Sequence, residues 1–212
     1  MFDISITPDK LILIAIFLLV GFPVHEAAHA FAADRLGDST ARHLGRLSLN
    51  PIKHFDPLGG TLFVLSVILG GFIIGWAKPT PYNPSNLRDR RNGELVVALA
   101  GPAVNVILAC LAALVIRLLV ATDSIASIPE LVGTVLLYFV YYNVALTIFN
   151  LIPVPPLDGS QVLFRLLDPV TAWRLRPLLA QYGLLVVLLV VLLFGQVIGS
   201  VMLHVTLFLV GG

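Results

Sequence analysis

The stretch "VGFPVHEAAHAFAADRLG", Val20 to Gly37, places two histidines and a glutamate at the end of a long apolar run. That run, "LILIAIFLLVGF", has the composition of a membrane span, which needs about 20 apolar residues. A charged residue inside a span costs about 2.5–3.5 kcal/mol on insertion scales, so an isolated one is unfavourable. The stretch therefore predicts a membrane helix over Lys10–Asp34 that carries a functional or internally paired polar cluster.

The composition of the whole chain agrees with a protein dissolved in lipid. Of its 212 residues, 58% are hydrophobic and only 12% are charged, against about 25% charged in soluble domains. The net charge of +1, without a basic face carrying aromatics, gives no indication of a nucleic-acid partner. The single cysteine, Cys110, excludes an intrachain disulfide. The N-terminus "MFDISITPDK" lacks a basic n-region, so we expect no cleaved signal peptide.

Hydrophobic segments predict an all-α polytopic membrane protein with about four to six membrane segments, forming one integral membrane domain over residues 1–212. Its core is expected at residues 10–160. The last apolar segment could be one tilted helix or a hairpin broken near Gly195–Gln196, and residues 160–177 before it read as an amphipathic interfacial segment. The apolar segments are Lys10–Asp34, Leu58–Trp76, Glu94–Val120, Leu131–Ile152 and Leu178–Val210.

The second segment, Leu58–Trp76, either crosses the membrane or re-enters and leaves on the same side. If it re-enters, every lysine and arginine except Lys10 and Arg117 shares one face, whereas a crossing splits them. Because cytoplasmic loops carry an excess of basic residues, the distribution favours re-entry with the basic side cytoplasmic. Gly70–Gly71 near its middle would permit a tight turn.

The histidine pair has the H-E-x-x-H spacing of a metal site. His25 and His29 lie on one face of a helix, and Glu26 stays close to that face. This arrangement is typical of two zinc ligands and a general base that activates water. The alternative is that the three polar groups pair with one another as packing contacts. Pro23, two residues earlier, should kink the helix.

A catalytic zinc needs a third protein ligand, and Asp158 in "FNLIPVPPLDGSQ" is the strongest candidate, ahead of His43, His54 and His204. Asp158 could equally be only the N-cap of the following helix. The histidines and Asp158 lie at C-terminal ends of the first and fourth segments. These ends share a membrane face only if the second segment re-enters; otherwise they are roughly 30 Å apart.

With these motifs the chain resembles the site-2 protease family of intramembrane zinc metalloproteases, in a compact prokaryotic form without a PDZ or CBS domain. The resemblance implies one zinc ion per chain held by His25, His29 and Asp158, with Glu26 as the base and Asn150 near the substrate. Many members have two glycines after the aspartate, where this chain has "DGS". The motifs that carry the resemblance are "HEAAHA" (His25–Ala30), "NPIKHFDPLG" (Asn50–Gly59), "GWAKPTPYNP" (Gly75–Pro84), "AGPAVN" (Ala100–Asn105) and "FNLIPVPPLDG" (Phe149–Gly159).

Two further residues are weaker candidates. The resemblance makes His54 a candidate for a contact to a ligand or to the transition state, or else it is an interfacial loop histidine. Asn105 follows a Gly-Pro step and is more typical of a hydrogen bond between helices than of direct catalysis. The connectors Arg42–Pro51 and Gly75–Pro84 read as extended or β segments near the active site. One of them, or the re-entrant segment, could hold an extended substrate by strand addition.

Taken together, the residues and the resemblance predict an intramembrane zinc endopeptidase. Its partners would be the lipid bilayer and a membrane protein substrate with a transmembrane segment. We expect it in a prokaryotic inner membrane with the active site toward the cytoplasmic face; the sequence leaves the oligomeric state open. The alternatives are a non-catalytic zinc-binding membrane scaffold, for which Glu26 would be superfluous, and a transporter, for which the polar residues lie at too uniform a depth.

Overall fold

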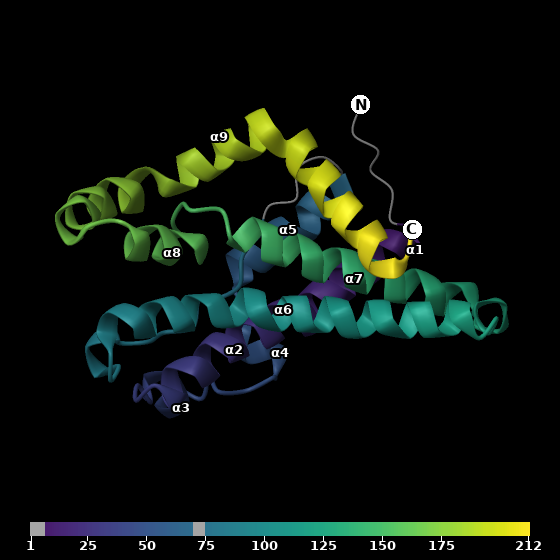
Figure 1. Ribbon diagram of the computed structural model, residues 1–212, viewed down its shortest axis with the longest axis horizontal. Helices are drawn as coiled ribbons and strands as arrows, with labels where there is room; N and C mark the ends of the chain where they lie inside the picture. The colour runs from purple at the N-terminus through teal and green to yellow at the C-terminus, as the bar shows by residue number, and fades with distance from the viewer. Residues whose placement is uncertain (1–6, 70–74) are drawn as a thin grey trace.

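The computed structural model describes residues 7–69 and 75–212, and within these ranges the chain is almost entirely helical (Figure 1). In chain order the elements are α1 (Pro8–Ile16), η1 (Phe17–Gly21), α2 (Phe22–Arg35), α3 (Thr40–His43), α4 (Pro51–His54), α5 (Pro57–Leu69), η2 (Pro84–Asn86), α6 (Arg90–Ala121), η3 (Ile125–Ser127), α7 (Glu130–Asn150), α8 (Gly159–Leu166) and α9 (Pro169–Val210).

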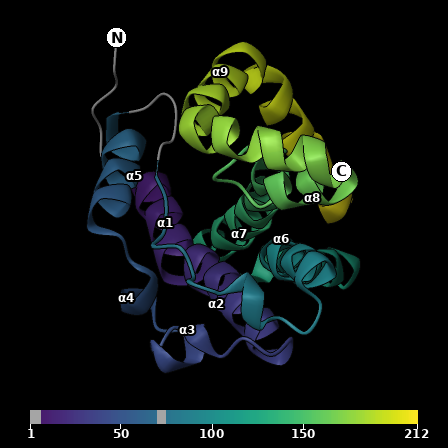
Figure 2. The same ribbon diagram turned by 90° about the vertical axis from the view of Figure 1, so that its left-hand side faces the viewer.

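Four helices are long and apolar enough to cross a membrane, which confirms the prediction of an all-α polytopic membrane protein. They are the continuous helix Pro8–Arg35, α6, α7 and α9. Helices α6 and α7 pack side by side and antiparallel through small and β-branched residues, among them Ala109, Ala113 and Val140 (Figures 1 and 2). Small residues let the two backbones approach closely where no water drives helices together.

The first span contains a π-helical turn, η1, directly before Pro23. The amide of Phe22 donates to the carbonyl of Phe17, five residues back. Pro23 has no N–H to continue the regular ladder, and a single π turn is one way in which a helix absorbs that interruption. The bend expected at Pro23 is therefore accommodated by one extra residue in the turn, just before the histidine pair begins.

The second apolar segment turns back, as predicted. The described part of α5 covers 13 residues, about 20 Å at 1.5 Å per residue, and by Trp76 the chain is back at the start of this helix. The returning chain lies directly on the start of α5, because a Cβ added to Gly59 would be 2.2 Å from the carbonyl oxygen of Trp76. The amide of Lys78 then donates to the carbonyl of His54 at 2.9 Å. The turn expected at Gly70–Gly71 lies outside the described residues.

The re-entrant helix is held by aromatic packing. Phe63 of α5 stacks on Phe17 of η1, with ring centroids 4.1 Å apart, and Tyr142 of α7 meets Phe17 edge-on at 6.2 Å. Phe63 is fully buried. Offset and edge-to-face pairs of this kind add about 0.5–1.5 kcal/mol each to the apolar burial. Helix α5 is therefore packed against the protein interior on the side of the first span and α7.

The β character expected for the connectors is wrong for the described residues. Residues 42–51 contain the end of α3 and a turn through Gly45 at φ +67°, and no strand is assigned there. The reason lies in local capping: Asn50 accepts a hydrogen bond from the amide of Ile52, and Pro51 begins α4. Residues 75–83 also lack an assigned strand and run as an irregular connector across α2.

The C-terminal segment is one helix, α9, of 42 residues, so a hairpin broken near Gly195–Gln196 is excluded. Its length is about 63 Å, twice the thickness of a hydrocarbon core, and Figure 1 shows it bent. The expected interfacial segment becomes α8 and the first turns of α9. Arg176 of α9 reaches Glu94 of α6 at 3.0 Å, which fastens this end to the bundle.

Asp38 joins the end of α2 to the connector that follows the re-entrant segment. Its carboxylate is fully buried and accepts from the hydroxyl of Thr40 at 2.6 Å, the amide of Asn83 at 2.7 Å and the side chain of Asn86 at 2.8 Å. Burial alone would raise the pKa of Asp38, but hydrogen bonds from Thr40, Asn86 and Asn83 outweigh it and hold this pKa below the usual range of an aspartate. The ionised form is therefore the one that the fold uses.

Replacing Asp38 by Asn should destabilise the protein at neutral pH by roughly 1–3 kcal/mol. One acceptor oxygen would become an NH2 group, which cannot accept the hydrogen bonds that the carboxylate receives. A depressed folded-state pKa contributes stability that is present above the unfolded-state pKa and lost as pH falls through the folded-state pKa. The difference in free energy of unfolding between the wild type and Asp38→Asn should therefore become smaller below about pH 4. Thermal unfolding in detergent at pH 7 and at pH 3 measures it; a difference that does not change with pH would contradict this account.

Candidate metal centre

Two histidines of α2 face α6 at the closest approach of these helices. His25 and His29 are 4% and 7% exposed and lie one turn apart, with their Nε2 atoms at 3.1 Å. Ala30 and Ala33 on the same side are fully buried, which leaves room for α6 against α2. The expected shared face of the pair is thus formed, and it points into the protein rather than toward lipid.

Asp158 joins the pair from the loop between α7 and α8. Its Oδ2 lies 3.1 Å from Nε2 of His25 and 3.4 Å from Nε2 of His29. Asp158 occupies the N-cap position of α8, yet its side chain makes no capping hydrogen bond. Its Oδ2 is buried and has no hydrogen-bond partner among the described residues. The carboxylate is therefore directed to the histidines and not to the helix that it precedes.

The three donor atoms fit a metal ion better than they fit one another. Nδ1 of His29 lies 2.7 Å from the carbonyl oxygen of Val97, and Nδ1 of His25 lies 2.6 Å from Oδ1 of Asn105. Both acceptors require the proton on Nδ1, so in the neutral imidazole, which is the form that binds metals, each Nε2 presents a lone pair. Two lone pairs and a carboxylate oxygen that converge without a proton repel one another unless a cation lies between them.

The spacing is that of a tetrahedral zinc site. Zinc binds histidine nitrogen and carboxylate oxygen at about 2.0–2.1 Å, so two ligands of a tetrahedron lie about 3.3 Å apart. The three observed separations, 3.1, 3.1 and 3.4 Å, fall around this value. Among the described residues, His25, His29 and Asp158 are the group of histidine, cysteine and acidic side chains that could hold one ion. A site with three protein ligands keeps a fourth position open.

Asn105 links the metal site to a chain of buried amides. Its Oδ1 accepts from His25, and its Nδ2 donates to Oδ1 of Asn143 at 2.8 Å. Asn143 in turn donates to the carbonyl of Phe139 at 2.8 Å. Both asparagines are fully buried. The chain fixes the amide orientation of Asn105 and hence the tautomer of His25, so the packing role expected for Asn105 includes a contact to a candidate ligand.

Replacing Asn105 by Ala should lower zinc affinity by about 10- to 100-fold, the usual effect of removing a partner of a ligating histidine. Asn150 provides the matched control, since its amide donates to a carbonyl of its own helix, that of Leu146, at 3.0 Å. Asn150→Ala should leave zinc affinity unchanged. Competition with a chelator of known affinity measures both variants, and equal zinc binding by Asn105→Ala and the wild type would contradict this role.

Gly101 of α6 is a component of the site that sequence reasoning missed. A Cβ at this position would lie 2.5 Å from Cε1 of His25, 2.5 Å from Nε2 of His29 and 2.6 Å from Nε2 of His25. Real Cβ atoms do not approach other atoms so closely, so only glycine fits without displacing the rings. The motif "AGPAVN" contained the signal, but a glycine in a membrane helix usually indicates helix packing alone.

Glu26 lies on the neighbouring side of α2, and the connector 75–83 runs over it. The amide of Thr80 donates to Oε2 of Glu26 at 2.7 Å, and the hydroxyl of Thr80 donates to the carbonyl of Glu26 at 2.9 Å. Within the described residues, Oε1 of Glu26 accepts no hydrogen bond. Glu26 is therefore next to the candidate ligands in sequence, fixed through one carboxylate oxygen, and free to accept a proton on the other.

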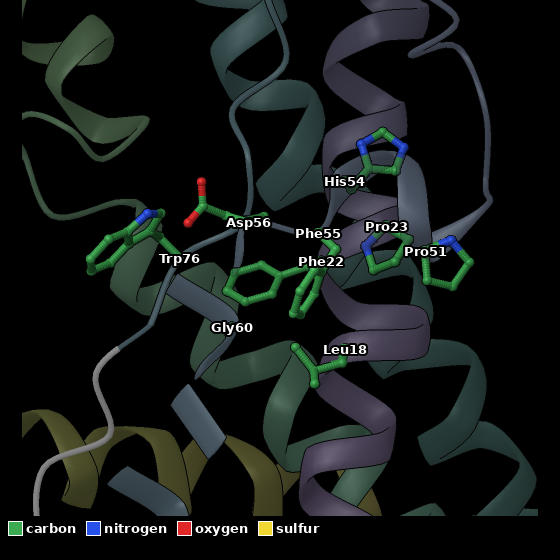
Figure 3. A pocket seen from close by; sticks show the side chains of 10 residues that line it. Leu18, Phe22, Pro23, Pro51, His54, Phe55, Asp56, Gly60 and Trp76 are labelled. Atoms are coloured by element: carbon green, nitrogen blue, oxygen red, sulfur yellow. The ribbon is translucent and has the colours of Figure 1, made fainter. Parts of the chain in front are cut away.

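The remaining candidates lie outside the cluster of donor atoms. His54 is buried and places its Nε2 2.7 Å from the carbonyl of Ser48. It lines a small cavity of about 10 Å³, room for about one water, beside Pro23 and Phe22 (Figure 3). The amide of Asn150 is bonded along its own helix, as described above. His204 lies on α9 with its Nδ1 2.7 Å from the carbonyl of Ser200.

The fold fits a membrane-embedded metallopeptidase, and two histidines and one aspartate form its candidate zinc site. The profile of peptidase family M50 matches residues 12–194. The chain therefore belongs to family M50, the site-2 protease family, and zinc is the metal of its site.

Curated relatives carry names that agree with this family. A protein of Bacillus subtilis (strain 168) named "Putative zinc metalloprotease YwhC" is 38% identical over 158 residues, which is 74% of this chain and 69% of that protein. "Putative zinc metalloprotease Rip2" of Mycolicibacterium smegmatis is 35% identical over 175 residues, 82% of this chain and 64% of that protein. The matches thus span about two thirds of each relative's length. No solved structure gives a significant match.

Proposed function

We propose that this chain is an intramembrane endopeptidase that hydrolyses peptide bonds in or near transmembrane segments of membrane proteins, with Glu26 as general base. The observation that carries the proposal is the depth of the site. His25 and His29 lie inside the helix Pro8–Arg35, about 15 Å and 9 Å from its end at Arg35 by helical rise. A site within a membrane-spanning helix lies at the depth that the transmembrane segment of a substrate occupies.

In the proposed mechanism, zinc at this site would supply a Lewis acid that makes water nucleophilic near neutral pH. Glu26 holds the attacking water through Oε1 while Thr80 holds Oε2. As the water oxygen attacks the substrate carbonyl carbon, its proton passes to Glu26. Glu26 then gives this proton to the amide nitrogen of the substrate as the C–N bond breaks, which releases the new amine. The products are two shorter membrane peptides, and no redox step is involved.

The distribution of charge supports a site that opens toward the cytoplasm. The end of α2, α3 and the start of α6 gather at one end of the bundle (Figure 1), and these elements carry Arg35, Arg42 and Arg90. The opposite end carries Lys10 of α1 and Arg117 of α6. Because basic residues are enriched on the cytoplasmic side, the metal site lies nearer to that face. The bilayer would be the inner membrane of a prokaryotic cell.

Cleavage of single-span test substrates in lipid nanodiscs, followed by mass spectrometry of both products, tests the proposed function. We expect cuts inside or within a few residues of the span, on its cytoplasmic half. Cuts confined to soluble tails far from the membrane would show a metalloprotease that is not intramembrane. The substrates should include spans with helix-destabilising residues, because a peptide bond must leave the helix before water reaches it.

A further inference from the structure

Residues 77–83 form a strap across α2, and its central residue makes both of its side-chain and amide contacts with one amino acid. Thr80 donates from its amide to Oε2 of Glu26 at 2.7 Å and from its hydroxyl to the carbonyl of Glu26 at 2.9 Å. The two contacts join segments 54 positions apart in the sequence. One bond fixes the carboxylate and the other fixes the backbone that carries it, so together they define the direction of the side chain.

The strap is stiff where it crosses Glu26. Pro79 and Pro81 flank Thr80. Prolines have no amide hydrogen and restrict both their own backbone and that of the residue before them. The amide of Thr80 is therefore the single backbone donor of the three-residue segment 79–81. It is presented by a segment that loses little entropy when the bond forms.

Both ends of the strap are fastened to buried groups. At one end the amide of Lys78 donates to the carbonyl of His54 at 2.9 Å, next to the start of the re-entrant segment. At the other end the amide of Asn83 donates to the buried carboxylate of Asp38 at 2.7 Å. A stiff segment held on both sides of Thr80 can transmit an orientation to Glu26, which a free loop could not.

We propose that Thr80 is the positioning residue for the general base: its hydroxyl fastens the strap to the backbone of Glu26, which places its amide against Oε2 and leaves Oε1 available for water and its proton. The inference rests on the proposed function of Glu26. It assigns no contact between Thr80 and the substrate or the metal ion. If Glu26 populated several side-chain orientations, only a fraction of the enzyme would be in the reactive geometry at any time. The strap should therefore affect kcat rather than substrate binding.

Thr80→Val tests the proposal, because it removes the hydroxyl and keeps the size and branching of the side chain. We expect kcat to fall roughly 3- to 10-fold, the range for one hydrogen bond, with KM and zinc content unchanged. Thr80→Ser, which retains the hydroxyl, should restore kcat. Thr122→Val is the matched control, since the hydroxyl of Thr122 also donates to a backbone carbonyl, that of Leu118, at the far end of α6.

The outcomes separate this inference from the proposed function. Unchanged kcat in Thr80→Val, while Glu26→Gln is inactive, would overturn the positioning role alone. Activity retained by Glu26→Gln would overturn the base itself. A rise in KM at constant kcat would place the strap against the substrate and overturn the inference. Loss of zinc by both Thr80→Val and Thr80→Ala would overturn the inference as well.

Discussion

Glu26→Gln should lower the rate of substrate cleavage by about 10³-fold or more while the protein still binds one zinc ion per chain. A glutamine has the shape of glutamate, and its side-chain oxygen can still accept the hydrogen bond from Thr80. It cannot accept a proton at neutral pH, and general base catalysis commonly contributes 10²–10⁴-fold. Cleavage of a single-span substrate and the zinc content of the same preparation give the two numbers.

Asp34→Asn is the control for this substitution, because it makes the same change of carboxylate to amide two turns further along the same helix. Asp34 is largely covered, pairs with the exposed side chain of Arg42 and lies outside the group of metal donors. An asparagine keeps a side-chain oxygen that can accept from Arg42 and the change touches no metal donor, so activity should stay close to that of the wild type. Cleavage by Glu26→Gln at more than a tenth of the wild-type rate would show that another group accepts the proton.

Gly101→Ala should lower zinc affinity at least 100-fold and abolish cleavage, although it adds a single methyl group. The added Cβ would lie 2.5 Å from ring atoms of both His25 and His29. Either the rings or α6 must then move by several tenths of an ångström. Metal–ligand distances tolerate about 0.2 Å, and the hydrogen bonds of the rings to Val97 and Asn105 resist rotation. Zinc binding by competition and thermal unfolding are the measurements.

Gly199→Ala is the matched control, since an added Cβ at this position of α9 meets nothing within 4 Å. Alanine is the better helix former by about 1 kcal/mol, so this variant should bind zinc normally and be equally or slightly more stable. If Gly101→Ala keeps both zinc and activity, the close approach of α6 to the histidines does not shape the site as described.

Much of the architecture could be predicted because the hydrocarbon core of a membrane constrains which residues a spanning segment can contain. Spans require long apolar runs, and the basic residues between them indicate which ends share a face. That reasoning gave the first three long helices and the return of the Leu58–Trp76 segment, both of which the structure has. Whether the last apolar segment forms one helix, Pro169–Val210, or a hairpin could not be decided from the sequence, because glycines within an apolar run do not distinguish a bent helix from a hairpin.

The site was only partly readable for a different reason. The side chains with metal-binding chemistry, His25, His29 and Asp158, stand out in any sequence. Gly101, Asn143 and Thr80 have ordinary residue types, and their importance comes from which atoms lie beside them after folding. The extended reading of residues 42–51 failed because Asn50 and Pro51 begin a helical turn there. Local capping outweighed a weak alternation of polar and apolar residues.

The most direct test of the central claim is to remove zinc from the purified protein with a chelator and to restore it in measured amounts. We predict that the zinc-free protein cuts no single-span substrate and that activity rises in proportion to added zinc, reaching its maximum at one ion per chain. His29→Ala should show no such recovery at the same zinc concentrations. Cleavage that persists at full rate in protein shown to be free of zinc would contradict the claim that this buried site performs the hydrolysis.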